Sequence, residues 1–333
     1  MTALHSFLFA DFLGTATWLW LAFFAVVISL LVFDLGVLHR DQHEIGVKES
    51  LLLSAGYITV GLLFAVWVWF QKGGDAGMDY LTGFLIEKSL SMDNVFLMAV
   101  IFSFLGIPRR YQHKVLFWGI LGVIVLRAVM IGLGAALIHQ FSWILYVFGV
   151  FLLLTGVRML FARVDETPDL ENNLLVRFLR SHLRITDRLH EQRFFVRLPG
   201  ASGRPVLWIT PLFLALILIE CADLVFAVDS VPAIFAITQD PFIVYTSNIF
   251  AILGLRALYF ALAALIHRFA YLKYALALVL VFIGGKIFLV GIIGKIPAAL
   301  SLGVTLTLLI GGVLVSLWKT RHAAGDATRA SQQ

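Results

Sequence analysis

Charged residues are scarce in this sequence. Asp, Glu, Lys and Arg make up 14% of its 333 residues, 61% are hydrophobic, and the mean hydropathy is +0.96. Soluble proteins carry about 25% charged residues. This composition argues against a soluble globular domain and predicts a chain that crosses a membrane several times.

Cysteine is almost absent, since Cys221 is the only one. It forms no disulfide within the chain and no cysteine-rich metal site. We expect it to pack as a small apolar residue, with metal ligation beside Glu220 as the alternative. A nucleotide-binding loop, a nucleophile elbow and an HExxH motif are also missing. We therefore expect neither an enzyme nor a prosthetic group, and the N-terminus shows no cleaved signal peptide.

Nine apolar segments are long enough to cross a bilayer, which requires about 18 residues. They lie near 15–38, 50–70, 80–105, 115–138, 142–162, 206–227, 240–265, 271–293 and 297–318. The predicted fold is an all-α polytopic membrane protein with about nine transmembrane helices. The sixth segment stays apolar to Ile237. We expect a break or re-entrant turn at Ala227–Pro232, because proline removes a helix hydrogen bond.

Lys and Arg follow the odd-numbered segments, whereas the alternate loops hold only Lys72 and Lys295. Basic loops stay on the cytoplasmic side of a membrane. The pattern predicts an N-terminus outside and a C-terminal tail, 319–333, in the cytoplasm. Because the basic residues lie between apolar segments, the sequence pI of about 9.4 does not indicate a nucleic-acid partner.

The longest connection, 163–205, is rich in arginine. Its apolar residues form a loose stripe that predicts an amphipathic helix on the anionic inner leaflet. The stripe consists of Leu174, Leu175, Phe178, Leu179, Leu183 and Leu189. A regulatory or partner-docking role is the alternative.

Two acidic stretches resemble each other across 136 positions. Asp223–Val231 aligns with Glu87–Val95, so that Asp223 matches Glu87, Asp229 matches Asp93 and Ser230 matches Asn94. Further matches, such as Leu126-Arg127-Ala128 with Leu255-Arg256-Ala257, extend the similarity. Segments three to five are therefore predicted to repeat as segments six to eight.

The positions of the repeats divide the single membrane domain, 1–333. Two leading helices span 15–70, the first repeat spans 80–162, the second spans 206–293, and a final helix spans 297–318. Because segment three runs inward and segment six outward, the two repeats are expected to be inverted. Inverted repeats with polar segments at matching positions are typical of secondary transporters with a site near the midplane.

Ionised carboxylates within apolar membrane segments cost free energy, so their presence indicates a functional site. The proposed metal ligands are Glu87, Asp93, Asn94, Glu220, Asp223 and Asp229. We expect Glu220 and Asp223 to share a helix face, whereas acids six positions apart meet only if the helix unwinds. A site made of oxygen ligands suits hard divalent ions such as Mn²⁺, Mg²⁺ or Ca²⁺.

Intramembrane bases are the expected counter-charges for these acids. Arg127, Arg256 and Lys88 fill this role, and the alternative is that the acids serve only to pair with these bases. Further candidate ligands are Asp34, Ser230 and Asn248, of which Asn248 also fits an interhelical hydrogen bond. Gly132, Gly134, Gly284 and Gly285 are expected to permit close helix contacts.

Three stretches carry a family resemblance. GFLIEKSLSMDNVF, LIECADLVFAVDSVPAIFAITQDPFIVYTSNIFAILGLRALYF and the basic loop ending in FFVR resemble the TerC family of integral membrane proteins. The resemblance covers roughly Leu19 to Trp318, with Cys221 as a departure where a small polar residue is expected. It implies a multi-pass protein of the bacterial inner membrane, linked to manganese export.

The expected function is secondary export of a divalent cation, first Mn²⁺, coupled to protons. A Ca²⁺ or Mg²⁺ exchanger and a membrane scaffold or stress protein are the alternatives. The family's redox label carries less weight, because a single cysteine argues against dithiol chemistry. A homo-oligomer and contacts with other membrane or stress proteins stay open.

Overall fold

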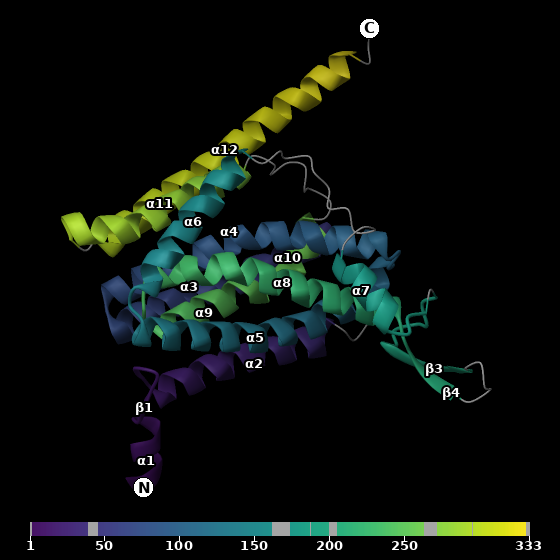
Figure 1. Cartoon of the computed structure of the whole chain (residues 1–333), viewed down its shortest axis with the longest axis horizontal. Helices are drawn as coiled ribbons and strands as arrows, with labels where there is room; N and C mark the ends of the chain where they lie inside the picture. The colour runs from purple at the N-terminus through teal and green to yellow at the C-terminus, as the bar shows by residue number, and fades with distance from the viewer. Residues whose placement is uncertain are drawn as a thin grey trace.

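The structure is a computed structural model that describes residues 2–38, 46–161, 174–186, 188–199, 205–262, 272–294 and 296–330. Helices dominate these residues, and two short antiparallel hairpins accompany them (Figure 1). At a few helical positions the side chain lies outside the description, including Asp93 and Arg256.

The helices match the nine predicted segments closely. They are α1 Thr2–Leu8, α2 Thr17–Leu38, α3 Val47–Lys72, α4 Gly74–Phe104, α5 Arg109–Gln140, α6 Ile144–Phe161, α7 Leu174–His182, α8 Pro211–Phe235, α9 Pro241–Leu253, α10 Leu255–Leu262, α11 Leu272–Ile293 and α12 Ala298–Ala330. Within the described ranges, eight segments are long and apolar enough to cross a membrane, α9 and α10 together forming one of them.

The remaining predicted segment is the third, 80–105, which corresponds to α4; this helix is long enough but carries more charge. Its 31 residues span about 46 Å at 1.5 Å per residue. Every stretch of 18 residues within it contains at least three charged side chains. These are the residues that make α4 a candidate functional helix.

The break predicted at Ala227–Pro232 is wrong. Helix α8 continues without interruption from Pro211 to Phe235, with Pro232 inside its last turn. Proline in that position removes one hydrogen bond near the helix end, where few further bonds are lost. The chain turns only after Phe235, and Asp240 caps α9 by accepting hydrogen bonds from the backbone N–H groups of Phe242 and Ile243.

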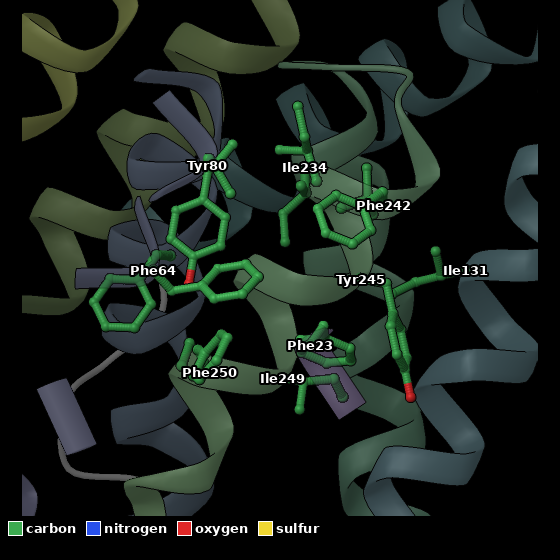
Figure 2. Close-up of a cluster of buried hydrophobic side chains, with 14 of the residues drawn as sticks. Phe23, Phe64, Tyr80, Ile131, Ile234, Phe242, Tyr245, Ile249 and Phe250 are labelled. Atoms are coloured by element: carbon green, nitrogen blue, oxygen red, sulfur yellow. The ribbon is translucent and has the colours of Figure 1, made fainter. Parts of the chain in front are cut away.

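Helix α9 lies at the centre of the bundle, and all its residues from Phe242 to Leu253 are buried. An aromatic and aliphatic cluster surrounds it, with side chains from α2, α3, α4, α5 and α8 (Figure 2). Its labelled members are Phe23, Phe64, Tyr80, Ile131, Ile234, Phe242, Tyr245, Ile249 and Phe250. This packing fixes the helices that carry the polar residues described below.

Helices α6, α11 and α12 form a second group beside this bundle (Figure 1). Close contact between α6 and α11 depends on Gly284, where an added Cβ would lie 2.9 Å from the Gly149 carbonyl oxygen. The expectation of close contacts is met for Gly134 as well. It is wrong for Gly132 and Gly285, which face open space.

The arginine-rich connection contains more structure than one amphipathic helix. Helix α7 buries Val176 and Leu179 against the bundle, and the exposed Leu174 and Phe178 lie on its outer side. Strands β3 Phe195–Pro199 and β4 Pro205–Ile209 then form a hairpin that the sequence did not predict. A smaller hairpin, β1 Asp11–Phe12 with β2 Thr15–Ala16, precedes α2.

Candidate functional site

The centre of the candidate site is Arg127, a fully buried arginine in the middle of α5. A buried charge costs several kcal/mol unless partners compensate it. Arg127 finds such partners on α4, α8 and α9, and each of its three nitrogens makes at least one contact.

Asp223 on α8 accepts two hydrogen bonds from this guanidinium. Nε lies 3.2 Å from Oδ2 and Nη2 lies 3.1 Å from Oδ1. Asn94 on α4 donates a further hydrogen bond to Oδ1 at 3.2 Å. Paired contacts of this kind fix both the position and the orientation of the carboxylate.

Glu87 on α4 binds the other side of the same guanidinium. Its Oε1 lies 3.0 Å from Nη1 of Arg127, and its Oε2 accepts a hydrogen bond from Asn248 at 3.2 Å. Asn248 on α9 in turn accepts from Nη1 at 3.0 Å, and so does the Ser230 hydroxyl at 2.8 Å. Asn248 therefore makes the predicted interhelical hydrogen bonds.

The residues around Arg127 come in two matched pairs. Glu87 and Asn94 are seven positions apart, as are Asp223 and Ser230, so each pair lies on one helix face. These are the positions that the sequence alignment paired with each other. Glu87, Asp223 and Ser230 contact one guanidinium, and Asn94 joins them through its hydrogen bond to Asp223.

A cavity of about 390 Å³ adjoins this cluster and separates α4 and α8 from α6 and α11. Glu87, Asn94 and Ser230 form part of its wall. Asp229 also lines it and accepts a hydrogen bond from Thr155 of α6 at 3.4 Å. Basic residues, Arg158 and Lys273, lie in the wall formed by α6 and α11.

Glu220 does not join this cluster, although the sequence placed it on the same helix face as Asp223. Its carboxylate lies against α5, where an added Cβ on Gly122 would come within 2.3 Å of Oε1. Both carboxylate oxygens are inaccessible and find no hydrogen-bond donor in the described part of the chain. Three residues of helix turn Glu220 by about 60° from Asp223, enough to face a different helix.

Lys88 is also displaced from its predicted role. Its ammonium donates to the Ala251 carbonyl oxygen near the end of α9, at 3.0 Å, and pairs with no carboxylate among the described side chains. Asp34 is buried in α2 and is not among the residues that line the cavity. The side chains of Asp93 and Arg256, also predicted site residues, lie outside the described part.

The cluster has an excess of acid. Two carboxylates, Glu87 and Asp223, share the single guanidinium of Arg127. Asp229 adds a third carboxylate in the adjoining cavity, where Arg158 and Lys273 are also in the wall. No three His, Cys, Asp or Glu side chains lie together in metal-binding geometry within the described residues. Direct coordination of a cation by Glu87 and Asp223 therefore requires Arg127 to release them.

Sequence reasoning missed two participants. Thr155 was assigned no role, although it hydrogen-bonds Asp229 across the cavity. Gly122 was also missed, and it is the residue that admits the Glu220 side chain between α5 and α8. A buried acid opposite a glycine on a neighbouring helix leaves no signal in a single sequence until the helix pairing is known.

Comparison with known proteins gives consistent matches. The model of the family described as "Integral membrane protein TerC family" matches residues 72–324. An "Uncharacterized membrane protein" of Rickettsia bellii is 50% identical over 298 residues, covering 90% of this chain and 96% of the relative. The "Putative membrane-bound redox modulator Alx" of Escherichia coli is 48% identical over 309 residues, covering 90% and 94%. Among solved structures, none matches.

Proposed function

This chain belongs to the TerC family of integral membrane proteins, and we propose that it is a secondary transporter that exports a divalent metal cation. The observation that carries the proposal is the placement of Glu87 and Asp223 on one buried arginine. Ionisable residues within membrane segments are costly and mark ion pathways. Here they come from two helices that the sequence identifies as repeats.

Arg127 acts as an exchangeable counter-charge in this proposal. The guanidinium neutralises Glu87 and Asp223 while no cation is bound, which avoids two unpaired buried charges. A divalent cation replaces it and takes the two carboxylates, with Asn94, Ser230 and Asn248 as neutral oxygen donors. The carboxylates pair with Arg127 in the empty state and with the cation in the loaded state. Cation binding is therefore coupled to movement of Arg127.

The ligand chemistry selects the class of cargo. Carboxylate, amide and hydroxyl oxygens suit hard divalent ions, whereas soft ions prefer thiolates. Mn²⁺ is the first candidate, and Ca²⁺ and Mg²⁺ are alternatives that a series of competing metals ranks. Protons bind the same carboxylates on the return step, which couples cation export to proton uptake.

The arrangement of helices supports transport between two sides of the membrane. Helix α4 of the first proposed repeat packs on α9 of the second, and α8 of the second packs on α5 of the first, so these two contacts between the repeats are reciprocal. The cavity lies where α6 and α11 meet α4 and α8. Movement of one helix group against the other would open or close access to Glu87 and Asp229.

The scaffold hypothesis has less support. Helix α7 buries Val176 and Leu179 against the ends of the membrane helices, which makes it part of the bundle. The redox description of the relatives would require an electron-transferring group, and Cys221 alone offers no dithiol.

Transport by the purified protein in liposomes tests the proposal. A metal-sensing dye inside the vesicles reports Mn²⁺ flux, with and without a pH gradient. We expect flux in wild type, a reduction of at least tenfold in Glu87→Gln, and no change in Asp75→Asn. Asp75 is an exposed acid at the start of the same helix and serves as the matched control. Equal flux in protein-free vesicles would reject the proposal.

A further inference from the structure

The unit formed by α7 and the β3–β4 hairpin is strongly basic. Its described residues from 174 to 199 contain one acid, Glu191, and six arginines. The arginines are Arg177, Arg180, Arg184, Arg188, Arg193 and Arg197. This unit lies at the end of the bundle where α4 ends and α8 begins (Figure 1).

An open pocket of about 410 Å³ lies between this unit and the two helix ends. Arg180 and Arg184 contribute to one part of its lining, together with Thr186 and Trp208. Leu105 and Leu214 belong to the apolar part, which comes from the membrane helices. None of the described residues that line this pocket is acidic.

The polar groups at the pocket favour an anion. Arg180 stacks its guanidinium over the Phe104 ring, 5.9 Å from the centroid, which holds the charge at the rim. Arg184 lines the same pocket. Two guanidinium groups suit a phosphate group.

The position of the pocket relates it to a membrane surface. Helix α4 ends at Phe104 and α8 begins at Pro211, so the pocket lies where two membrane helices leave the bilayer. Large apolar side chains of the same unit are exposed, with Leu174 at 82% and Leu207 at 57%. Such residues favour the boundary between headgroups and acyl chains.

We propose that this pocket binds the phosphate headgroup of an anionic phospholipid. The lipid belongs to the leaflet on the side of the membrane where α7 lies. Arg180 and Arg184 contact the phosphate, and Trp208 forms part of the wall beside it. The apolar part around Leu105 and Leu214 receives the glycerol and the first methylenes. A free phosphate ion would satisfy only the basic part, so the lipid accounts for the whole lining.

Lipid binding by the full-length purified protein tests this inference. After delipidation in a neutral detergent, the protein is titrated with phosphatidylglycerol, phosphatidylcholine or inorganic phosphate, and bound lipid is counted by native mass spectrometry. The pocket variant is Arg180→Gln/Arg184→Gln. Arg177→Gln/Arg197→Gln is the matched control, because it removes the same charge from α7 and β3 outside the pocket.

We expect wild type and control to bind one phosphatidylglycerol at least tenfold more tightly than the pocket variant does. Equal losses in both double variants would mean diffuse charge attraction and overturn the proposal, as would equal binding of phosphatidylcholine. Full competition by millimolar phosphate would identify a free-anion site instead. If the double variant does not purify, Arg184→Glu at an exposed position gives the same test, and unchanged lipid binding there contradicts the proposal.

Discussion

Arg127 and Asp223 form a two-point contact inside the helix bundle, with Nε 3.2 Å from Oδ2 and Nη2 3.1 Å from Oδ1. Both side chains are buried, at 0% and 4% exposure. Glu87 on α4 contacts the same guanidinium. A buried arginine shared by two carboxylates makes the stability of the fold and the chemistry of the site depend on the same three residues.

Removing the arginine charge is expected to destabilise the protein. Arg127→Gln leaves Glu87 and Asp223 buried without a positive partner, which costs about 3–5 kcal/mol. The measurement is the midpoint of thermal unfolding in detergent. Arg127→Gln combined with Glu87→Gln and Asp223→Asn removes all three charges and is expected to recover most of this loss. Equal destabilisation of the single and triple variants would show that the charges are not coupled.

The close contact between α5 and α8 depends on Gly122, a residue without a side chain. In Gly122→Ala the new Cβ would lie 2.3 Å from Oε1 of Glu220, so the helices or the side chain must shift. We expect a loss of about 1 kcal/mol in stability, at the low end for overpacking, because the atoms in the way belong to the end of the flexible Glu220 side chain. Gly132→Ala on the same helix has open space and is the control, expected to be neutral or slightly stabilising. Similar melting of both variants would contradict the close contact.

The cavity between the two helix groups is expected to be reachable by a water-soluble reagent. Cys221→Ser gives a background without cysteine, since Cys221 is the only one. Thr155→Cys in this background places a thiol in the cavity wall and should react with a charged thiol reagent. Thr246→Cys, at a fully buried position of α9, is the unreactive control. Protection of Thr155→Cys by Mn²⁺ would place the cation near Asp229, whereas equal labelling of both variants would contradict the cavity.

Asp240 precedes α9, caps this helix and forms an ion pair with Lys72. Asp240→Ala loses both interactions and is expected to cost about 1–2 kcal/mol, mainly through the cap. Lys72→Met leaves the cap in place but removes the partly buried ion pair and the hydrogen bond from the Lys72 ammonium to the Thr15 hydroxyl, and should cost about 1 kcal/mol. Chemical denaturation in mild detergent compares them. A larger effect for Lys72→Met than for Asp240→Ala would show that the ion pair outweighs the cap.

Much of the fold was readable from the sequence because hydropathy and charge determine it. The apolar segments predicted the positions of the long helices, and the internal repeat predicted that Glu87 and Asp223 are equivalent. The hairpin β3–β4 escaped prediction because Val206, Leu207 and Ile209 read as the start of the next apolar segment. Pairing with β3, and backbone hydrogen bonds of Ile209 with Arg184 and Thr186, decide that they form a strand.

The site was only partly predictable, for geometric reasons. Helical spacing shows that acids six positions apart face different directions. The predicted break in the helix would have brought them together. The structure keeps α4 and α8 continuous, so Asp223 faces Arg127 while Asp229 faces the cavity. The position of Glu220 was not predictable either, because it depends on Gly122, which lies about 100 positions away in the chain.

The central claim is that Glu87 and Asp223 bind a divalent cation when Arg127 releases them. Direct Mn²⁺ binding tests it, because free Mn²⁺ gives an electron paramagnetic resonance signal that broadens when the ion binds. We expect wild type and Asp75→Asn to bind one Mn²⁺ per chain, and Asp223→Asn to bind it at least tenfold more weakly while melting cooperatively. Unchanged Mn²⁺ affinity in folded Asp223→Asn would contradict the account.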